Sequence, residues 1–220
     1  SNLRRQRQMC IRDRLGALLK MKIYDVAFLG MGASALATAK LKYKGTSISL
    51  IGIDKNYHSK RNNFFAFWLT DWMKDFDSLA QKKWFCWNFY LTNNHIKHET
   101  KDLPYCTIRY QDWKNYCLKG LENLSIKEFN VQSISNLKKY YEIKLENGEE
   151  IFAKKIYDSR TPKLENEKVK QHFFGYLIET KQIINSNSVT LMDFRVEQKM
   201  GLHFMYCLPI DENRMLVEST

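Results

Sequence analysis

"YDVAFLGMGASALATAK", residues 24–40, decides the fold. In this stretch a short apolar run ends at Gly30, a second glycine follows at Gly32, and an alanine-rich segment continues the chain. Apolar runs of this length are typical of buried strands, and the pattern that follows is typical of a helix. We therefore predict a strand over residues 24–30, a tight turn, and a helix over residues 32–44.

The turn has the glycine spacing of a dinucleotide-binding fingerprint, with alanine in the third place. Gly30 permits the tight turn, Gly32 lets a pyrophosphate approach the backbone, and the small Ala35 lets helix and strand pack closely. The pyrophosphate would meet the N–H groups and the positive dipole end at the helix start, where Ala33 lies. A glycine turn with a purely structural role is the alternative.

The stretch "SISLIGID", residues 47–54, predicts a second strand and completes a βαβ unit. It ends in Asp54, which is 22 residues beyond Gly32 and is placed to accept hydrogen bonds from an adenosine ribose. The predicted strand, the predicted helix and the position of Asp54 together indicate a bound dinucleotide, but the fingerprint does not distinguish FAD from NAD.

Further elements are predicted downstream. A helix is expected around residues 111–121, and alternation on both sides of Asn147-Gly148 predicts a β-hairpin. Four strand-like runs follow, at residues 171–180, 188–196, 202–210 and 214–220, with the turn "DEN" between the last two. This order predicts an α/β fold: a Rossmann-like FAD-binding domain with an inserted antiparallel β-sheet substrate lobe.

We assign residues 21–60 and about 111–162 to the nucleotide-binding part, and residues 61–110 and 163–220 to the substrate lobe. Residues 1–20 hold six basic residues and one acid out of a formal net charge of +11. We interpret them as a non-native or disordered leader, with a native basic arm as the alternative.

The five cysteines are odd in number and form no C-x-x-C pair, which indicates reduced thiols in a cytoplasmic protein and neither a disulfide framework nor a metal site. The longest uncharged apolar runs, "NFFAFWL" and "FMYCLPI", are too short to span a bilayer. The cysteines are Cys10, Cys86, Cys106, Cys117 and Cys207.

Five motifs occur along the chain in the following order: "YDVAFLGMGASALA", "YDSRTP", "QHFFGYLIET", "VTLMDFRVEQ" and "FMYCLPIDENRMLVEST". Together they resemble the FAD-dependent lycopene cyclase family of carotenoid biosynthesis. That family has a flavin-binding start, a D-x-R-G element, a Q-x-F-x-G-x-x-(I/V)-E-T strand, an L-M-D strand, and a strand pair ending in L-x-E-(E/D)-T.

The resemblance implies a flavoprotein that closes rings at the ends of a linear carotenoid. The net reaction is an isomerisation, yet the FAD must be reduced, with NAD(P)H as a candidate reductant. The resemblance places the proton donor at Glu218 and places Asp158 and Arg160 near the flavin. It also implies peripheral contact with the inner face of a membrane.

The chemistry of an alkene-protonating acid agrees with this assignment. Such an acid must be neutral at working pH, and an apolar pocket raises a carboxyl pKa because burial disfavours the anion. Glu218 alternates with Leu216 and Thr220 on one face of the predicted last strand. An ordinary edge-strand carboxylate is the alternative.

Eleven of the 27 residues from Phe64 to Tyr90 are aromatic. They could line a polyene tunnel or a membrane interface, and aromatic faces stabilise carbocations. A buried aromatic core is the alternative. The nine residues singled out are Phe64, Phe65, Phe67, Trp68, Trp72, Trp84, Phe85, Trp87 and Phe89.

The chain departs from the family pattern at several positions. Thr161 replaces the glycine of D-x-R-G, Ser219 replaces the acid after Glu218, and Phe64-Phe65 replaces a polar-Trp pair. The chain is also shorter than the family, so we expect a fragment with an exposed strand edge, an incomplete flavin site and weak or absent activity.

Two other functions are alternatives to a cyclase. An FAD/NAD(P)H-dependent oxidoreductase or hydroxylase would use the same fold. A nucleic-acid binder would stack bases on exposed aromatics, but the basic excess lies in residues 1–20 and no RNA-binding motif is present, so we expect no nucleic-acid partner.

Overall fold

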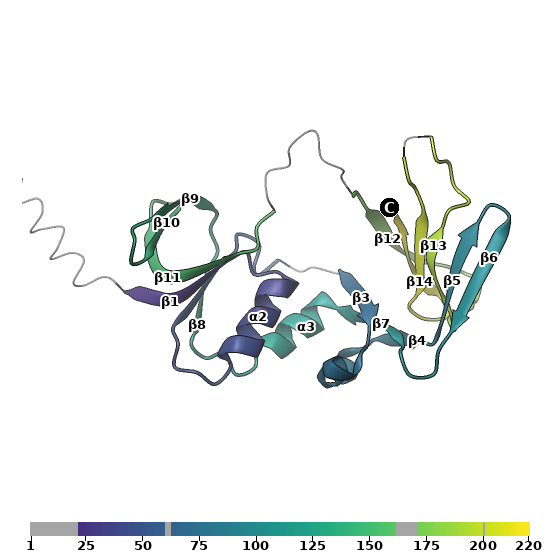
Figure 1. Cartoon of the computed structure of the whole chain (residues 1–220), viewed down its shortest axis with the longest axis horizontal. Coiled ribbons are helices and arrows are strands. Elements are labelled where there is room, and N and C mark those ends of the chain that lie inside the picture. The colour runs from purple at the N-terminus through teal and green to yellow at the C-terminus, as the bar shows by residue number, and fades with distance from the viewer. Residues whose placement is uncertain (1–21, 60–62, 162–170, 200) are drawn as a thin grey trace, which may run out of the picture. The chain divides into compact units, whose positions relative to one another are not determined.

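The computed structural model describes residues 22–59, 63–161, 171–199 and 201–220. The chain divides into two compact units (Figure 1), and both are discontinuous in sequence. Of the described residues, the first unit contains 22–59 and 114–161, and the second contains 63–113, 171–199 and 201–220. The leader, residues 1–20, lies outside the described residues.

The first unit is built on a six-stranded mixed sheet in the order β8-β2-β1-β11-β10-β9. β8, β2, β1 and β11 are parallel, whereas β10 is antiparallel to both β11 and β9. The strands are β1 (Ile23–Leu29), β2 (Leu50–Ile53), β8 (Leu124–Lys127), β9 (Val131–Asn136), β10 (Tyr141–Leu145) and β11 (Glu150–Asp158).

The described residues also form two α-helices, α2 (Ala33–Tyr43) and α3 (Tyr110–Leu118). The boundary between the two units falls within α3. α2 buries Ala35, Leu36, Ala39 and Tyr43. The ammonium group of Lys40 donates hydrogen bonds to the backbone carbonyls of Tyr116 and Lys119, which joins α2 to the end of α3.

The predicted βαβ unit is confirmed, because β1, α2 and β2 occur in that order and β1 pairs with β2 in parallel. All four residues of β2 are buried, as expected for a strand covered on both faces. β2 begins later than predicted, at Leu50. The preceding Ser49 instead bonds the carboxylate of Asp25 through its N–H (2.9 Å) and hydroxyl (2.8 Å).

The hairpin at Asn147-Gly148 is also confirmed, since β10 and β11 pair around it. Gly148 has φ +85°, the left-handed conformation that glycine adopts without strain. The core of the sheet consists of aliphatic residues from four strands: Ala27, Leu29, Ile51, Ile53, Ile143, Leu145, Ile151 and Ala153.

The second unit contains a six-stranded sheet, in the order β12-β15-β14-β13-β5-β6, and a three-stranded sheet, β3-β7-β4. All paired strands in these two sheets are antiparallel except β13 and β5, which pair with each other in parallel. The elements before α3 are β3 (Phe64–Trp68), the 3-10 helix η1 (Asp71–Leu79), β4 (Lys82–Trp84), β5 (Cys86–Leu91), β6 (Asn94–Glu99) and β7 (Tyr105–Arg109).

The four strands predicted after residue 170 are present, each shorter than its apolar run. They are β12 (Phe174–Glu179), β13 (Val189–Asp193), β14 (Met205–Pro209) and β15 (Arg214–Ser219). The "DEN" turn joins β14 to β15, and the carboxylate of Asp211 accepts hydrogen bonds from the N–H groups of Asn213 and Arg214. The mixed α/β architecture expected from the sequence is therefore confirmed.

None of the helices in the described part of the chain combines the length and the apolar character that crossing a bilayer requires. Four of the cysteines are free thiols, and Cys10 lies outside the described residues. Burial raises the pKa of Cys106 to about 11 and that of Cys117 to about 12. These two thiols are therefore poor nucleophiles at neutral pH.

Candidate functional sites

The first candidate site lies at the carboxyl ends of β1, β2 and β11. β2 and β8 lie on one side of β1, whereas β11 lies on the other. The strand order therefore reverses between β1 and β11, which makes this point the topological switch of the parallel part of the sheet. Open α/β sheets bind ligands at such a point.

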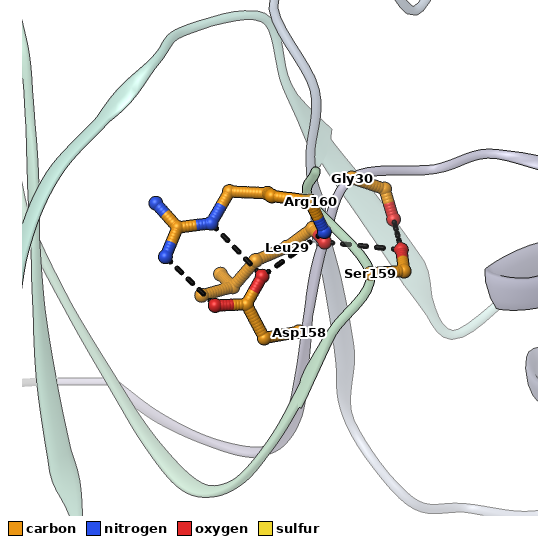
Figure 2. Close-up of polar contacts among 5 residues, drawn as sticks. All are labelled: Leu29, Gly30, Asp158, Ser159 and Arg160. Atoms are coloured by element: carbon orange, nitrogen blue, oxygen red, sulfur yellow. Dashed lines mark hydrogen bonds and ion pairs between the residues drawn. The ribbon is translucent and has the colours of Figure 1, made fainter. Parts of the chain in front are cut away.

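The glycine turn after β1 is bonded directly to the segment after β11. The hydroxyl of Ser159 lies 3.1 Å from the carbonyl oxygen of Leu29 and 2.9 Å from that of Gly30 (Figure 2), and the Ser159 N–H donates to Leu29 at 2.9 Å. Gly30 has φ +82°, and a Cβ there would lie 3.1 Å from the Ser159 oxygen. The turn therefore requires glycine at this position for both conformation and space.

Asp158 and Arg160 form a forked ion pair beside this turn (Figure 2). The guanidinium donates Nε to one carboxylate oxygen at 2.9 Å and Nη2 to the other at 2.7 Å. The Arg160 guanidinium lowers the pKa of Asp158. The backbone N–H of Arg160 also donates to the Asp158 carboxylate at 3.1 Å, and this hydrogen bond stabilises the turn between the two residues. The turn forms although Thr161 occupies the position at which the D-x-R-G pattern has glycine.

Asp54 ties the end of β2 to the same turn. Its Oδ2 accepts the N–H of Met31 at 2.9 Å, and its Oδ1 accepts the N–H of Asn56 at 2.9 Å. The side chain of Met31 is fully buried, and it packs on Gly52, where a Cβ would meet the Met31 sulfur at 2.6 Å. Gly52 therefore makes room for Met31 under the turn.

Gly32 begins α2 in an extended conformation and provides no side-chain cap, and the first turn of the helix has no acidic residue. A Cβ at Gly32 would meet nothing within 4 Å. Gly32 therefore leaves open space beside the positive dipole end of this helix. Ala33 is half-buried and Ala35 is buried in the helix face.

The structure thus brings the predicted cofactor-binding residues to one end of one sheet. They are Gly30, Gly32, Ala33, Ala35, Asp54, Asp158 and Arg160. Sequence reasoning missed Ser159 and Gly52. A glycine inside the apolar run "LIGI" was the available signal for Gly52, because glycine in a strand often marks a close approach.

The second candidate site is a cavity of about 450 Å³ within the second unit. Its wall is mainly aromatic and aliphatic, and Glu218 is the only acidic side chain among its described lining residues. Leu216, Glu218 and Thr220 all line it, which is the alternating face predicted for the last strand. The aromatic lining includes Phe64, Phe65, Trp68, Phe89, Phe173 and Phe204.

The nine aromatic residues singled out from the sequence therefore have different environments. Phe64, Phe65, Trp68 and Phe89 line the cavity. Trp84 and Trp87 belong to a buried core that also contains Val189, Leu191 and Leu208. Trp72 and Phe85 are exposed, and Phe67 stacks on Phe65 with 6.3 Å between ring centroids. The core interpretation is confirmed for Trp84 and Trp87, whereas the polyene-tunnel interpretation stays a prediction.

Glu218 is half-buried, and burial raises the pKa of its carboxyl group. In the sheet it stands directly opposite Tyr206 of β14, and side chains opposite each other share a face. The Tyr206 hydroxyl lies 2.7 Å from the Tyr105 hydroxyl. Burial is the largest cause that raises the pKa of both tyrosines, and the nearby Glu218 contributes in the same direction.

Ser219 stands where the family has an acid, and it points to the other face of β15. Its hydroxyl lies 2.8 Å from Nε2 of His203, whose Nδ1 lies 3.1 Å from the carbonyl oxygen of Glu197. A carbonyl only accepts, so Nδ1 donates to it, while Nε2 shares a hydrogen bond with the Ser219 hydroxyl. At position 219 the chain thus has a hydroxyl bonded to His203 in place of the acid.

Known structures share this fold at low sequence identity. The chain aligns with the tetracycline destructase Tet(51) at TM-score 0.56 and 14% identity, covering 90% of this chain and 56% of that one. It aligns with p-nitrophenol 4-monooxygenase PnpA from Pseudomonas putida DLL-E4 at TM-score 0.60 and 14% identity, with coverages of 90% and 57%.

A third match is halogenase PltM in complex with phloroglucinol and FAD, at TM-score 0.57 and 12% identity, with coverages of 89% and 51%. The chain thus spans about half the length of the solved structures that it matches. No curated protein matches it.

The sequence itself matches the model of a protein family over nearly all of the described chain. That family is described as "Lycopene cyclase protein", and the match covers residues 25–220, which include both candidate sites. The chain is therefore a member of the lycopene cyclase family.

Proposed function

We propose that this protein is a flavoprotein that cyclises the end group of a linear carotenoid by acid catalysis, without net oxidation or reduction. The observation that carries the proposal is the position of Glu218: a carboxyl group with a raised pKa in a cavity with aromatic and aliphatic walls. A neutral acid beside hydrocarbon is what protonation of an alkene requires.

The residues of the first site fit FAD. The bare backbone at Gly32 and the start of α2 suit a pyrophosphate, and the carboxylate of Asp54 is placed at the end of β2 for a ribose. Asp158 and Arg160 would flank the bound cofactor. Reduced FAD, when bound, would supply negative charge that stabilises a carbocation. NAD(P)H is the reductant we propose.

In the proposed reaction, Glu218 gives its proton to a terminal double bond of the substrate. The π electrons form the new C–H bond and leave a tertiary carbocation, which the neighbouring double bond attacks to close the ring. The ring-closed cation then loses a ring proton to the carboxylate left at Glu218, which regenerates the acid, so product and substrate are isomers. The aromatic walls would serve this step because the faces of aromatic rings stabilise cations.

The likeness to p-nitrophenol 4-monooxygenase PnpA supports a second candidate, an FAD/NAD(P)H-dependent oxidoreductase or hydroxylase. The two functions differ in electron balance. A cyclase converts lycopene without consuming NAD(P)H in proportion to product, whereas a hydroxylase oxidises one NAD(P)H per turnover.

We also propose peripheral contact with the inner face of a membrane, because a carotenoid substrate is dissolved in lipid. Strongly exposed apolar side chains in the second unit support it: Phe173, Phe174, Ile183 and Leu202. Flotation of the protein with lipid vesicles tests this contact. Replacement of Ile183 and Leu202 by serine should reduce the floated fraction, and unchanged flotation would contradict the proposal.

The deciding experiment is expression of the full reading frame that encodes this chain in bacteria that accumulate lycopene, with pigments separated by chromatography. The parent protein should form cyclised carotenoids, and Glu218→Gln should form none although it is produced and binds flavin. Cyclisation by the Glu218→Gln variant would reject Glu218 as the acid. Absence of product from both, with steady NAD(P)H oxidation by the purified flavoprotein, would favour the second candidate.

A further inference from the structure

Gly175 lies on the edge strand β12, directly opposite Glu218 of β15. Glu218 therefore has Tyr206 as its neighbour on one side and Gly175 on the other. Directly opposed residues in antiparallel strands share a face. The missing side chain at position 175 thus leaves space beside Glu218, on the face that lines the cavity.

The side chain of Glu218 occupies this space. A Cβ at Gly175 would lie 2.4 Å from Cγ of Glu218, 3.1 Å from its Oε1 and 3.2 Å from its Cδ. The shortest of these distances is far below van der Waals contact between carbon atoms, which is about 3.5–4.0 Å. Any residue other than glycine would force Glu218 out of its observed position.

The backbone gives no other reason for glycine here. Gly175 is absent from the residues with positive φ in the described part of the chain, and the pairing of β12 with β15 runs without a bulge from Phe174 to Glu179. Any L-residue could adopt this extended conformation. The requirement at this position is therefore for space.

We propose that Gly175 is a positioning residue that sets the direction of the Glu218 side chain across β12. This assigns a physical role to the glycine of "QHFFGYLIET". The steric part of the inference stands on the geometry alone, whereas its catalytic consequence rests on the proposed function of Glu218. A misplacement of about 1 Å at a reacting group can cost about 100-fold in rate.

The test compares Gly175→Ala with Tyr176→Ala, which alters the next residue of the same strand on the opposite face. Gly175→Ala should lower kcat for ring closure by about 10- to 100-fold with little change in KM. It should also move the Glu218 carboxyl signal in a ¹³C spectrum of protein labelled at glutamate carboxyls. Glu218→Gln identifies that signal by its loss, and Tyr176→Ala should change neither quantity.

An unmoved Glu218 signal in Gly175→Ala would overturn the steric inference, and a moved signal with unchanged kcat would overturn the catalytic one. If Glu218→Gln still cyclises lycopene, the proposed role of Glu218 as the acid fails, while the carboxyl signal of the parent and Gly175→Ala proteins continues to report on the position of Glu218. Should Gly175→Ala fail to fold, the double variant with Glu218→Ala should fold again, because the added methyl group then displaces nothing. Failure of that rescue would also overturn the inference.

Discussion

Met31 donates its backbone N–H to the carboxylate of Asp54 across 2.9 Å, so the glycine turn after β1 and the end of β2 hold each other. The acid expected to bind a ribose therefore also shapes the turn that would bind the pyrophosphate. A single carboxylate can do both because each oxygen accepts more than one hydrogen bond.

Replacement of Asp54 should accordingly weaken flavin binding in two ways, because it removes the expected hydrogen bond to the ribose and the observed hydrogen bond that holds the glycine turn. Hydrogen bonds to a charged group contribute about 1.5–3 kcal/mol, so Asp54→Ala should raise the FAD dissociation constant by about 10- to 100-fold. Asp54→Asn keeps one acceptor oxygen and should lose less. Fluorescence titration with FAD measures both, and equal affinity in all three proteins would contradict a role for this side chain.

Gly30 and Gly148 offer a matched pair of glycines in the left-handed conformation, with φ +82° and +85°. Alanine in that conformation costs about 1–2 kcal/mol, so Gly148→Ala should lower the free energy of unfolding by about this amount and Gly30→Ala by at least as much. Only Gly30→Ala should also lose flavin binding, because its Cβ would crowd Ser159, whereas a Cβ at Gly148 would meet nothing within 4 Å. Denaturant unfolding and FAD titration separate the two effects.

Glu218→Gln should reduce cyclisation by at least about 100-fold, the low end of what general acids contribute. The pH dependence has a definite sign. The acid acts while protonated, so the rate should fall as pH rises through its raised pKa. The same group contributes stability below its unfolded-state pKa, and that stability is lost as pH rises through the folded-state pKa. A rate that increases with pH over this range would contradict the role.

The hydroxyl pair of Tyr105 and Tyr206 should behave as a coupled unit, because the two oxygens lie 2.7 Å apart at the wall of the cavity. Tyr206→Phe leaves the buried Tyr105 hydroxyl without this partner and should cost about 1–3 kcal/mol of stability. Tyr105→Phe should cost a similar amount, and the double variant should cost less than the sum. Additive losses in denaturant unfolding would show that the two hydroxyls do not interact.

Several parts of the fold could be predicted because their signals are local. The glycine spacing after β1 and the Asn147-Gly148 turn each lie within a few residues, and β15 alternates along one face. β6 and β9 could not be predicted in this way. All six residues of β6 are exposed, and β9 reads "VQSISN" with mainly exposed residues, so neither has an apolar pattern to recognise.

The same distinction holds for the candidate sites. Gly30, Gly32 and Asp54 could be identified from spacing within one βαβ unit. Ser159 and Gly175 could not, because their partners are distant in sequence and become neighbours only through strand pairing. The roles of the predicted cofactor residues and of Glu218 remain predictions until binding and turnover are measured.

The hydrogen bond from Ser159 to Leu29 spans 130 positions of the chain. A ribosome releases β1, α2 and β2 long before it has synthesised β11, and contacts of such large sequence separation form slowly. The glycine turn therefore gains its contact with β11 only after the whole first segment of the second unit, residues 61–113, has been synthesised. Binding of the cofactor should accordingly be a late event in biogenesis, and nascent chains that end before Ser159 should not retain FAD.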